Sequence, residues 1–134
     1  SEVLHSFAGE LATTFDIRSS FEQTPGLDIL DPLIAEHLFR IAQEAANNAL
    51  KHSRAKEIVF KLHRERELAV MIIESKGDQW SLPKEICGGV GLRLMRYRAD
   101  LIGADLSLQP CAQGGTVVTC SLPYHPNTNT QMPE

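Results

Sequence analysis

Apolar residues recur along the chain at two spacings, one typical of helices and the other typical of strands. Asp31 and Pro32 precede the clearest helical segment, Leu33–Lys51. An aspartate caps free backbone N–H groups and a proline is tolerated at the first helical position, so this pair is typical of a helix start. The apolar stripe of the predicted helix consists of Ile34, Leu38, Ile41, Ala45 and Ala49.

Two shorter segments, Val3–Phe15 and Gly91–Ile102, have the same helical spacing. Gly103 follows the second segment and is typical of a helix end. Strands are predicted where apolar and polar positions alternate, or where a short apolar run lies between turn signals. The predicted strands are Asp16–Glu22, Glu57–His63, Leu68–Glu74, Ala104–Gln109 and Thr116–Leu122.

The segments between the strands indicate how the strands connect. Residues 64–67 form a short polar stretch, and Gly114-Gly115 lies between the last two strands. Both features are typical of hairpins. The stretch Ser75–Val90 has no periodicity and is predicted to be a long loop, which in a compact domain is usually functional or disordered.

This order of helices and paired strands predicts an α+β fold. We expect a two-layer α/β sandwich, in which a mixed, mostly antiparallel sheet is covered on one face by helices. The chain has 134 residues, which suits one domain better than two. We expect that domain to occupy residues 1–125 as a piece of a longer protein, and residues 126–134 to form a flexible polar tail.

Charge and cysteine content narrow the possible partners. The net charge is -4 and the isoelectric point is about 5.7, so no basic surplus points to nucleic acid or to an anionic membrane. No apolar run approaches the roughly 20 residues of a membrane span, and no membrane contact by this domain is expected. The cysteines Cys87, Cys111 and Cys120 form no CxxC pair, which favours reduced thiols in the cytoplasm over a disulfide frame or a zinc site.

The predicted long helix also carries three polar side chains on one face. Glu44, Asn48 and Lys51 follow one another at spacings of four and three residues. Asn48 offers a carbonyl oxygen to magnesium, Glu44 can orient water or accept a proton, and Lys51 can reach a phosphate. The set suits a nucleotide with magnesium, although the same spacing also describes an ordinary solvated helix face.

Glycines lead into the last predicted helix, in the run Gly88-Gly89-Val90-Gly91-Leu92. Glycines let a backbone approach a phosphate, and a helix N-terminus presents free N–H groups to it. The run follows a loop rather than a strand, so a dinucleotide-binding fold is not favoured, and a plain flexible loop end is the alternative. Gly114-Gly115-Thr116 taken alone describes an ordinary hairpin turn.

The order of these pieces resembles one known family. Residues 37–53, HLFRIAQEAANNALKHS, closely resemble the N-box of sensor histidine kinases, especially the subfamily of nitrate and membrane-fluidity sensors. Gly89-Val90-Gly91-Leu92 and the helix after it resemble the second glycine box of that subfamily. Gly114-Gly115-Thr116 resembles its closing glycine-threonine element, and the similarity extends from about residue 10 to residue 123.

The resemblance implies the ATP-binding (Bergerat) fold shared by gyrase, a heat-shock chaperone, histidine kinases and MutL-type ATPases. In that fold ATP lies between the N-box helix and a mobile lid. By resemblance, Asn48 is the magnesium ligand, Glu44 the catalytic N-box carboxylate and Lys51 a phosphate contact. The resemblance adds four further ATP-binding positions: Gly89 and Gly91, which let the lid close over the phosphates, Leu92 beside them, and Thr116, which helps to hold adenine, usually through water.

The first glycine box departs from the family pattern. The family has Asp-x-Gly-x-Gly after the second hairpin strand, and its aspartate accepts a hydrogen bond from the adenine amino group. The aligned run here is Ser75-Lys76-Gly77-Asp78-Gln79, so Gly77 is kept and serine replaces the aspartate. Losing that charge-assisted bond would cost about 1.5–3 kcal/mol, and Ser75 would recover part of it through a water. Glu74 is expected to point to the other face of the strand.

Three functions are compatible with these features. The first is the ATP-binding catalytic domain of a two-component sensor histidine kinase, which donates the γ-phosphoryl group to a histidine on a partner domain. The second is a pseudokinase domain that has lost ATP and acts as a protein-interaction module, which Ser75 and Gln79 favour. The third is an anti-sigma-type serine kinase, which the wording of the N-box disfavours.

The resemblance implies partners as well. They are ATP with magnesium, the dimerisation and phosphoacceptor domain of the same kinase, and a response regulator. His5 lies too close to the domain and lacks acidic neighbours of the family's kind, so the chain alone is not expected to phosphorylate itself. We expect it in the cytoplasm, as for the cytoplasmic part of a membrane-bound sensor.

Overall fold

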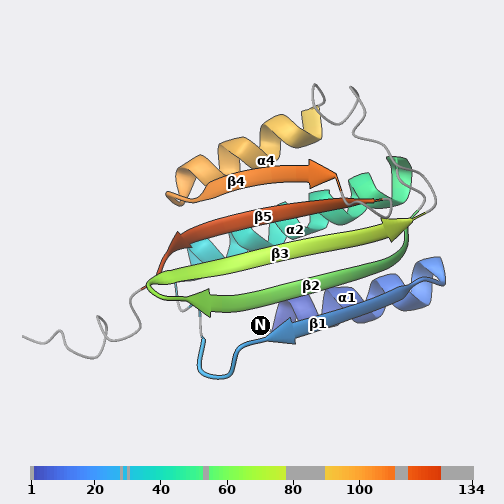
Figure 1. Cartoon of the computed structure of the whole chain (residues 1–134), viewed down its shortest axis with the longest axis horizontal. Helices are drawn as coiled ribbons and strands as arrows, with labels where there is room; N and C mark the ends of the chain where they lie inside the picture. Colours follow the sequence, from blue (N-terminus) through green and yellow to red (C-terminus); the bar gives the residue numbers. More distant parts are fainter. Residues whose placement is uncertain are drawn as a thin grey trace, which may run out of the picture.

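The computed structural model describes residues 2–27, 29, 31–52, 55–77, 90–110 and 115–124. Helices, a single strand and two pairs of consecutive strands follow one another along this part of the chain (Figure 1). In order they are α1 (Glu2–Phe15), β1 (Arg18–Gln23), α2 (Pro32–His52), β2 (Ala55–Glu65), β3 (Leu68–Gly77), α4 (Val90–Leu101), β4 (Asp105–Pro110) and β5 (Thr116–Pro123).

The described strands form one mixed sheet in the order β1-β2-β3-β5-β4. β1 pairs with β2 in parallel, and the pairs β2–β3, β3–β5 and β4–β5 are antiparallel. The helices lie on one face of this sheet (Figure 1). The expected α+β fold, a two-layer sandwich with a mixed, mostly antiparallel sheet, is therefore confirmed.

The apolar stripe of α2 packs onto the sheet and forms the centre of the core. Ile41 and Ala45 are buried there with Phe60 of β2, whose ring lies 5.8 Å from the ring of Phe7 on α1. Four buried residues of α2 are alanines, which lets the helix backbone approach the sheet closely because the intervening side chains are small. They are Ala42, Ala45, Ala46 and Ala49.

The predicted helix boundaries have local causes that the structure confirms. Asp31 Oδ1 accepts hydrogen bonds from the backbone N–H of Leu33 at 2.9 Å and of Ile34 at 3.4 Å, and so caps α2. At the predicted end of the last helix, Gly103 has a φ of 71° and directs the chain out of α4 into β4.

Two boundary predictions were wrong. The turn between β2 and β3 is two residues, Arg66 and Glu67, because β2 continues through Glu65 and pairs it with Leu68. β3 runs to Gly77, so Ser75–Gly77 belong to the sheet rather than to a loop. Backbone pairing with β2 continues there although the hydrophobic alternation has ended. The rest of the predicted loop, 78–89, and the predicted tail, 126–134, lie outside the described residues.

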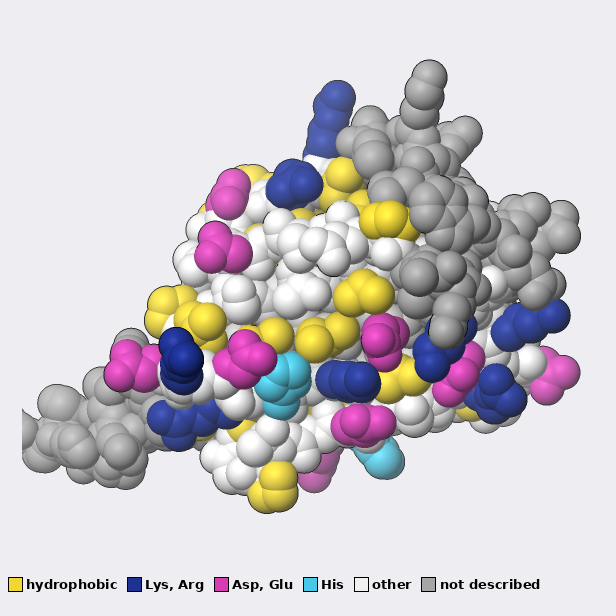
Figure 2. Space-filling view, viewed as in Figure 1, with side chains coloured by type: hydrophobic (Ala, Val, Ile, Leu, Met, Phe, Trp, Pro, Cys, Tyr) yellow, Lys and Arg dark blue, Asp and Glu magenta, His cyan; other side chains and the backbone are white. Residues whose placement is uncertain are grey.

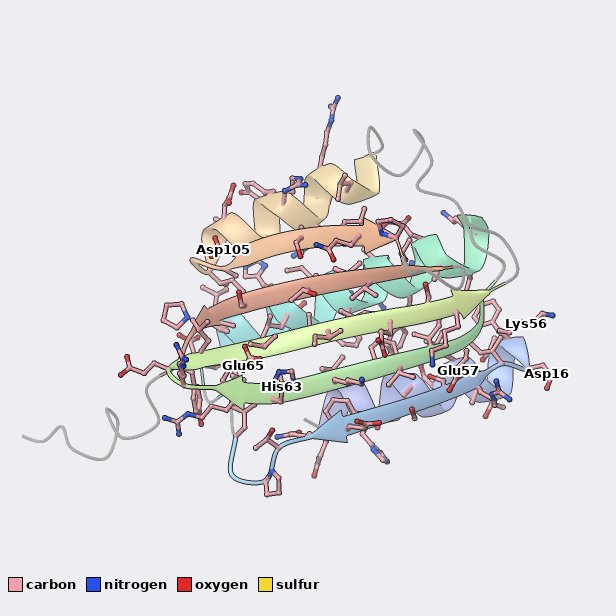
Figure 3. All side chains as sticks on the ribbon, in the orientation of Figure 1. Asp16, Lys56, Glu57, His63, Glu65 and Asp105 are labelled. Carbon is pink, nitrogen blue, oxygen red and sulfur yellow. The ribbon has the colours of Figure 1, made fainter. Side chains whose placement is uncertain are left out.

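The face of the sheet away from the helices carries charged side chains in short pairs (Figure 2). Lys61 pairs with Glu74 at 3.3 Å, and Arg18 pairs with Glu57 at 3.4 Å. Figure 3 shows Glu57 and His63 on β2. Such exposed pairs contribute little to stability. Among the described helices, none combines the length and the apolar character that crossing a membrane requires.

Candidate functional site

Four element ends meet at one end of the molecule. The C-terminal ends of α2 and β3 and the N-terminal ends of α4 and β5 lie together at the right of Figure 1. All predicted site residues within the described part are on these four elements, in the half of each that lies toward this end. They are Glu44, Asn48 and Lys51 on α2, Ser75 and Gly77 on β3, Gly91 and Leu92 on α4, and Thr116 on β5. Gly89 lies outside the described residues.

The polar face of α2 presents three of the predicted site side chains. Glu44 and Asn48 are half-buried, and Lys51, one turn further on, is exposed. Among the described residues, neither Glu44 nor Asn48 has a hydrogen-bond or ion-pair partner. A carboxylate and a carboxamide in this position can serve a ligand, since no hydrogen bond or ion pair with the described residues occupies them.

Gly91 brings the start of α4 against Glu44. A Cβ atom added at Gly91 would overlap Oε2 of Glu44, so only glycine lets the carboxylate lie this close to the start of α4. Leu92 next to it is buried, so its side chain packs into the core and its backbone N–H is the group that a ligand at the helix start could use. The free N–H groups of a first turn carry partial positive charge and suit a phosphate group.

A contact further along fixes α4 against α2. Nη1 of Arg98 donates a hydrogen bond to Nδ1 of His37 at 3.2 Å, which requires a ring nitrogen without a proton at that position. The pair is 61 residues apart in sequence. Nothing in the local sequence pattern indicated it, and sequence reasoning missed it.

Ser75 and Thr116 close the sheet side of the site. Oγ of Ser75 accepts a hydrogen bond from the backbone N–H of Thr116 at 3.1 Å and lies 3.1 Å from Oγ1 of Thr116. Gly115 has a φ of 98°, and a Cβ added to it would overlap the carbonyl oxygen of Ser75. Gly115 therefore allows β5 to begin directly against β3. From the sequence, the glycine pair indicated only a hairpin turn.

Glu74 does not replace the family aspartate. It faces the other side of the sheet, where it pairs with Lys61, while Ser75 is buried on the helix side. The expectation from strand alternation is confirmed, so the sheet side of the site has an uncharged hydroxyl where the family has a carboxylate.

Two other features lie away from this site. A hollow of about 440 Å³ opens at the opposite end of α2, lined mainly by apolar side chains such as Leu38, Phe39 and Leu62. Cys120 is a core residue. Burial, with the negative charge of Asp105 (labelled in Figure 3), raises the pKa of its thiol to about 12, so the thiolate is scarce at neutral pH.

Solved structures define the class of the fold. The ATP-binding domain of PrrB from Mycobacterium tuberculosis matches with a TM-score of 0.69 at 23% identity, covering 92% of this chain and 93% of that one. The catalytic domain of histidine kinase ThkA matches with a TM-score of 0.70 at 17% identity, covering 94% and 90%. The fold is that of a histidine kinase ATP-binding catalytic domain.

Sequence relatives agree with this class. Sensor protein VraS from Staphylococcus saprophyticus is 32% identical over 92 residues, covering 69% of this chain and 26% of that protein. Sensor protein VraS from Staphylococcus epidermidis is 30% identical over 97 residues, covering 72% and 28%. No family model matches the chain. The chain belongs to the catalytic domains of sensor histidine kinases, and it spans about a quarter of the length of these relatives.

Proposed function

We propose that this domain binds ATP with magnesium between α2 and the start of α4 and supplies the γ-phosphoryl group for histidine phosphorylation in two-component signalling. The observation that carries the proposal is the approach of Gly91 to Glu44, beside an Asn48 that has no partner among the described residues. Glycine at this position lets the carboxylate lie beside the free N–H groups of the first turn of α4, so acidic and amide groups of α2 and backbone donors of α4 meet at one place.

The residues present fit a magnesium ion. The side-chain carbonyl of Asn48 is a hard oxygen ligand, and magnesium commonly takes one or two protein ligands together with phosphate oxygens and waters. When bound, the ion would neutralise charge on the phosphates. Glu44 would orient the incoming group or accept its proton, and Lys51 would reach a phosphate oxygen. Phosphoryl transfer depends mainly on such positioning and charge stabilisation.

The start of α4 supplies the second wall. The backbone N–H groups of Gly91 and Leu92 belong to the first turn, where they have no partner within the helix. Arg93 and Arg96 on the same helix are exposed and add positive charge. Gly77 is the last described residue before 78–89, the segment in which the resemblance places Gly89 and the lid.

α4 has an exposed apolar surface to which a partner helix could bind. Leu94, Tyr97 and Leu101 are 45%, 61% and 52% exposed, and their spacing of three and four residues forms one apolar stripe. Such a stripe favours docking of another amphipathic helix. We assign it to the dimerisation and phosphoacceptor domain, which would bring a histidine to the phosphate end of α4. A response regulator would receive the phosphoryl group afterwards. We propose that the reaction takes place in the cytoplasm, where ATP is available.

The comparisons give no support to the interaction-module alternative. Glu44 and Asn48, which have no hydrogen-bond or ion-pair partner within the described part of the chain, favour catalysis over it. The test is calorimetric titration of the domain with a non-hydrolysable ATP analogue, with and without magnesium. We expect magnesium to strengthen binding in the wild type, and Asn48→Ala to lose at least about tenfold in affinity together with its magnesium dependence.

Asn47→Ala is the matched control, because Asn47 is the exposed neighbour on another face of α2. We expect it to bind like the wild type. Magnesium-dependent binding that persists in Asn48→Ala would remove Asn48 from the site. No binding by the folded wild type would overturn the proposed function.

A further inference from the structure

Ser75 and Thr116 are the buried polar side chains of the described residues, with 2% and 6% of their surface exposed. They lie where β3 ends and β5 begins, across the site from the phosphate-binding start of α4. With the phosphates at α4, the base of a nucleotide extends toward this uncharged wall. The hydrogen bonds of the pair therefore decide what the wall offers to a base.

The Ser75 hydroxyl has one hydrogen and two possible acceptors for it. They are the carbonyl oxygen of Thr116 at 3.3 Å and Oγ1 of Thr116 at 3.1 Å. The backbone N–H of Thr116 donates to Ser75 Oγ at 3.1 Å in either case. The pair can thus adopt two arrangements without moving any heavy atom.

In the first arrangement Ser75 donates to the carbonyl oxygen of Thr116, and the Thr116 hydroxyl donates to Ser75. The lone pairs of Thr116 Oγ1 then remain available as acceptors. In the second arrangement Ser75 donates to Oγ1 of Thr116, and the Thr116 hydrogen is free to be donated elsewhere. The same wall can present either an acceptor or a donor.

We propose that this pair makes the site accept purine nucleoside triphosphates with either an amino or a keto group at position 6. The inference rests on the proposed function. A fixed carboxylate only accepts hydrogen bonds, so it favours an amino group and repels a keto oxygen. The nearest carboxylate along β3, on Glu74, is on the opposite face and is paired with Lys61.

The test compares ATP with ITP, which has a keto group in place of the amino group at position 6. Both are titrated into the wild-type domain with magnesium. The two dissociation constants are expected to agree within about threefold, because the hydroxyl pair satisfies either group. Ser75→Asp is expected to shift the ratio toward ATP by at least about tenfold.

Two variants separate this effect from a general effect of charge or size. Ser75→Asn adds about the same volume as Ser75→Asp, but its amide can both donate and accept hydrogen bonds. The ratio of the ATP and ITP dissociation constants is therefore expected to stay near that of the wild type. Ser107→Asp adds a charge at an exposed position of β4 and also leaves the ratio unchanged. Circular dichroism checks the fold of each variant, and if Ser75→Asp does not fold, the wild-type and Ser75→Asn ratios decide.

A wild-type preference for ATP over ITP of more than about tenfold would overturn the inference and leave the proposed function intact. A folded Ser75→Asp variant with an unchanged ratio would also overturn it, since the base would then not meet this pair. Failure of the wild type to bind either nucleotide would overturn the proposed function, and this inference with it.

Discussion

Gly91 and Gly9 show how the surroundings of a residue change the effect of the same substitution. Both are helical, but a Cβ at Gly9 on α1 would meet nothing within 4 Å, while one at Gly91 would overlap the carboxylate of Glu44. The obstacle at Gly91 is the flexible end of a side chain. The fold can therefore tolerate a methyl group there, but only if Glu44 turns away from its position.

Gly91→Ala is expected to leave the domain folded and to weaken nucleotide binding and transfer, because it displaces Glu44 and fills the space beside the helix start. Gly9→Ala is expected to stabilise the domain by roughly 0.5–1 kcal/mol without changing binding. Urea denaturation measures the stability of both variants, and calorimetric titration measures their nucleotide affinity. Unaltered affinity in Gly91→Ala would mean that the phosphates do not meet the first turn of α4.

At the scale of the element, α4 has more apolar surface than the fold needs. Its core side carries Leu92, Met95 and Ala99, which are buried. A surface helix needs only one such face. The second stripe, formed by Leu94, Tyr97 and Leu101, is exposed on the helix whose start we propose as the phosphate site.

Replacing Tyr97 and Leu101 together by aspartate is expected to slow phosphoryl transfer to a separately supplied phosphoacceptor domain of the same kinase by at least about tenfold, because docking loses its apolar contact. ATP affinity is expected to stay unchanged. Leu33→Asp is the control, since Leu33 is 61% exposed at the far end of α2. Equal loss in the control, or none in the double variant, would contradict the role of this stripe.

Sequence reasoning succeeded for elements whose cause is local. The stripe and cap of α2, the glycine after α4 and the hairpins all depend on residues a few positions apart, and all of these are present in the structure. The end of β3 was missed because its pairing with β2 is made by the backbone and does not require apolar side chains.

The site could be predicted only in part for the same reason. The spacing of Glu44 and Asn48 on one helix follows from sequence, and the resemblance supplied the other residues. The bonds between Ser75 and Thr116 join positions 41 apart, and the contact of Gly91 with Glu44 joins two separate helices. Such contacts depend on the order of strands in the sheet, for which no periodic pattern exists.

At the scale of the whole molecule, the site joins the ends of four elements, so a bound nucleotide links them. Magnesium and an ATP analogue at about 100 times the dissociation constant are expected to add about 2.7 kcal/mol to the free energy of unfolding. Thermal unfolding followed by circular dichroism should show a higher midpoint for the wild type and a clearly smaller increase for Asn48→Ala, because a tenfold loss of affinity cuts the added free energy to about 1.4 kcal/mol or less. An equal increase in the variant would indicate binding elsewhere.

The two-residue turn between β2 and β3 has a consequence for how the domain folds. Residues that are close in sequence pair at little entropic cost, so this central hairpin is expected to form early. The bonds between Ser75 and Thr116 need β5 to arrive from 41 residues away, so they are expected to form late. Nucleotide then has no complete site until folding is nearly finished. It lengthens the lifetime of the native state by slowing unfolding, and it leaves the rate of folding unchanged.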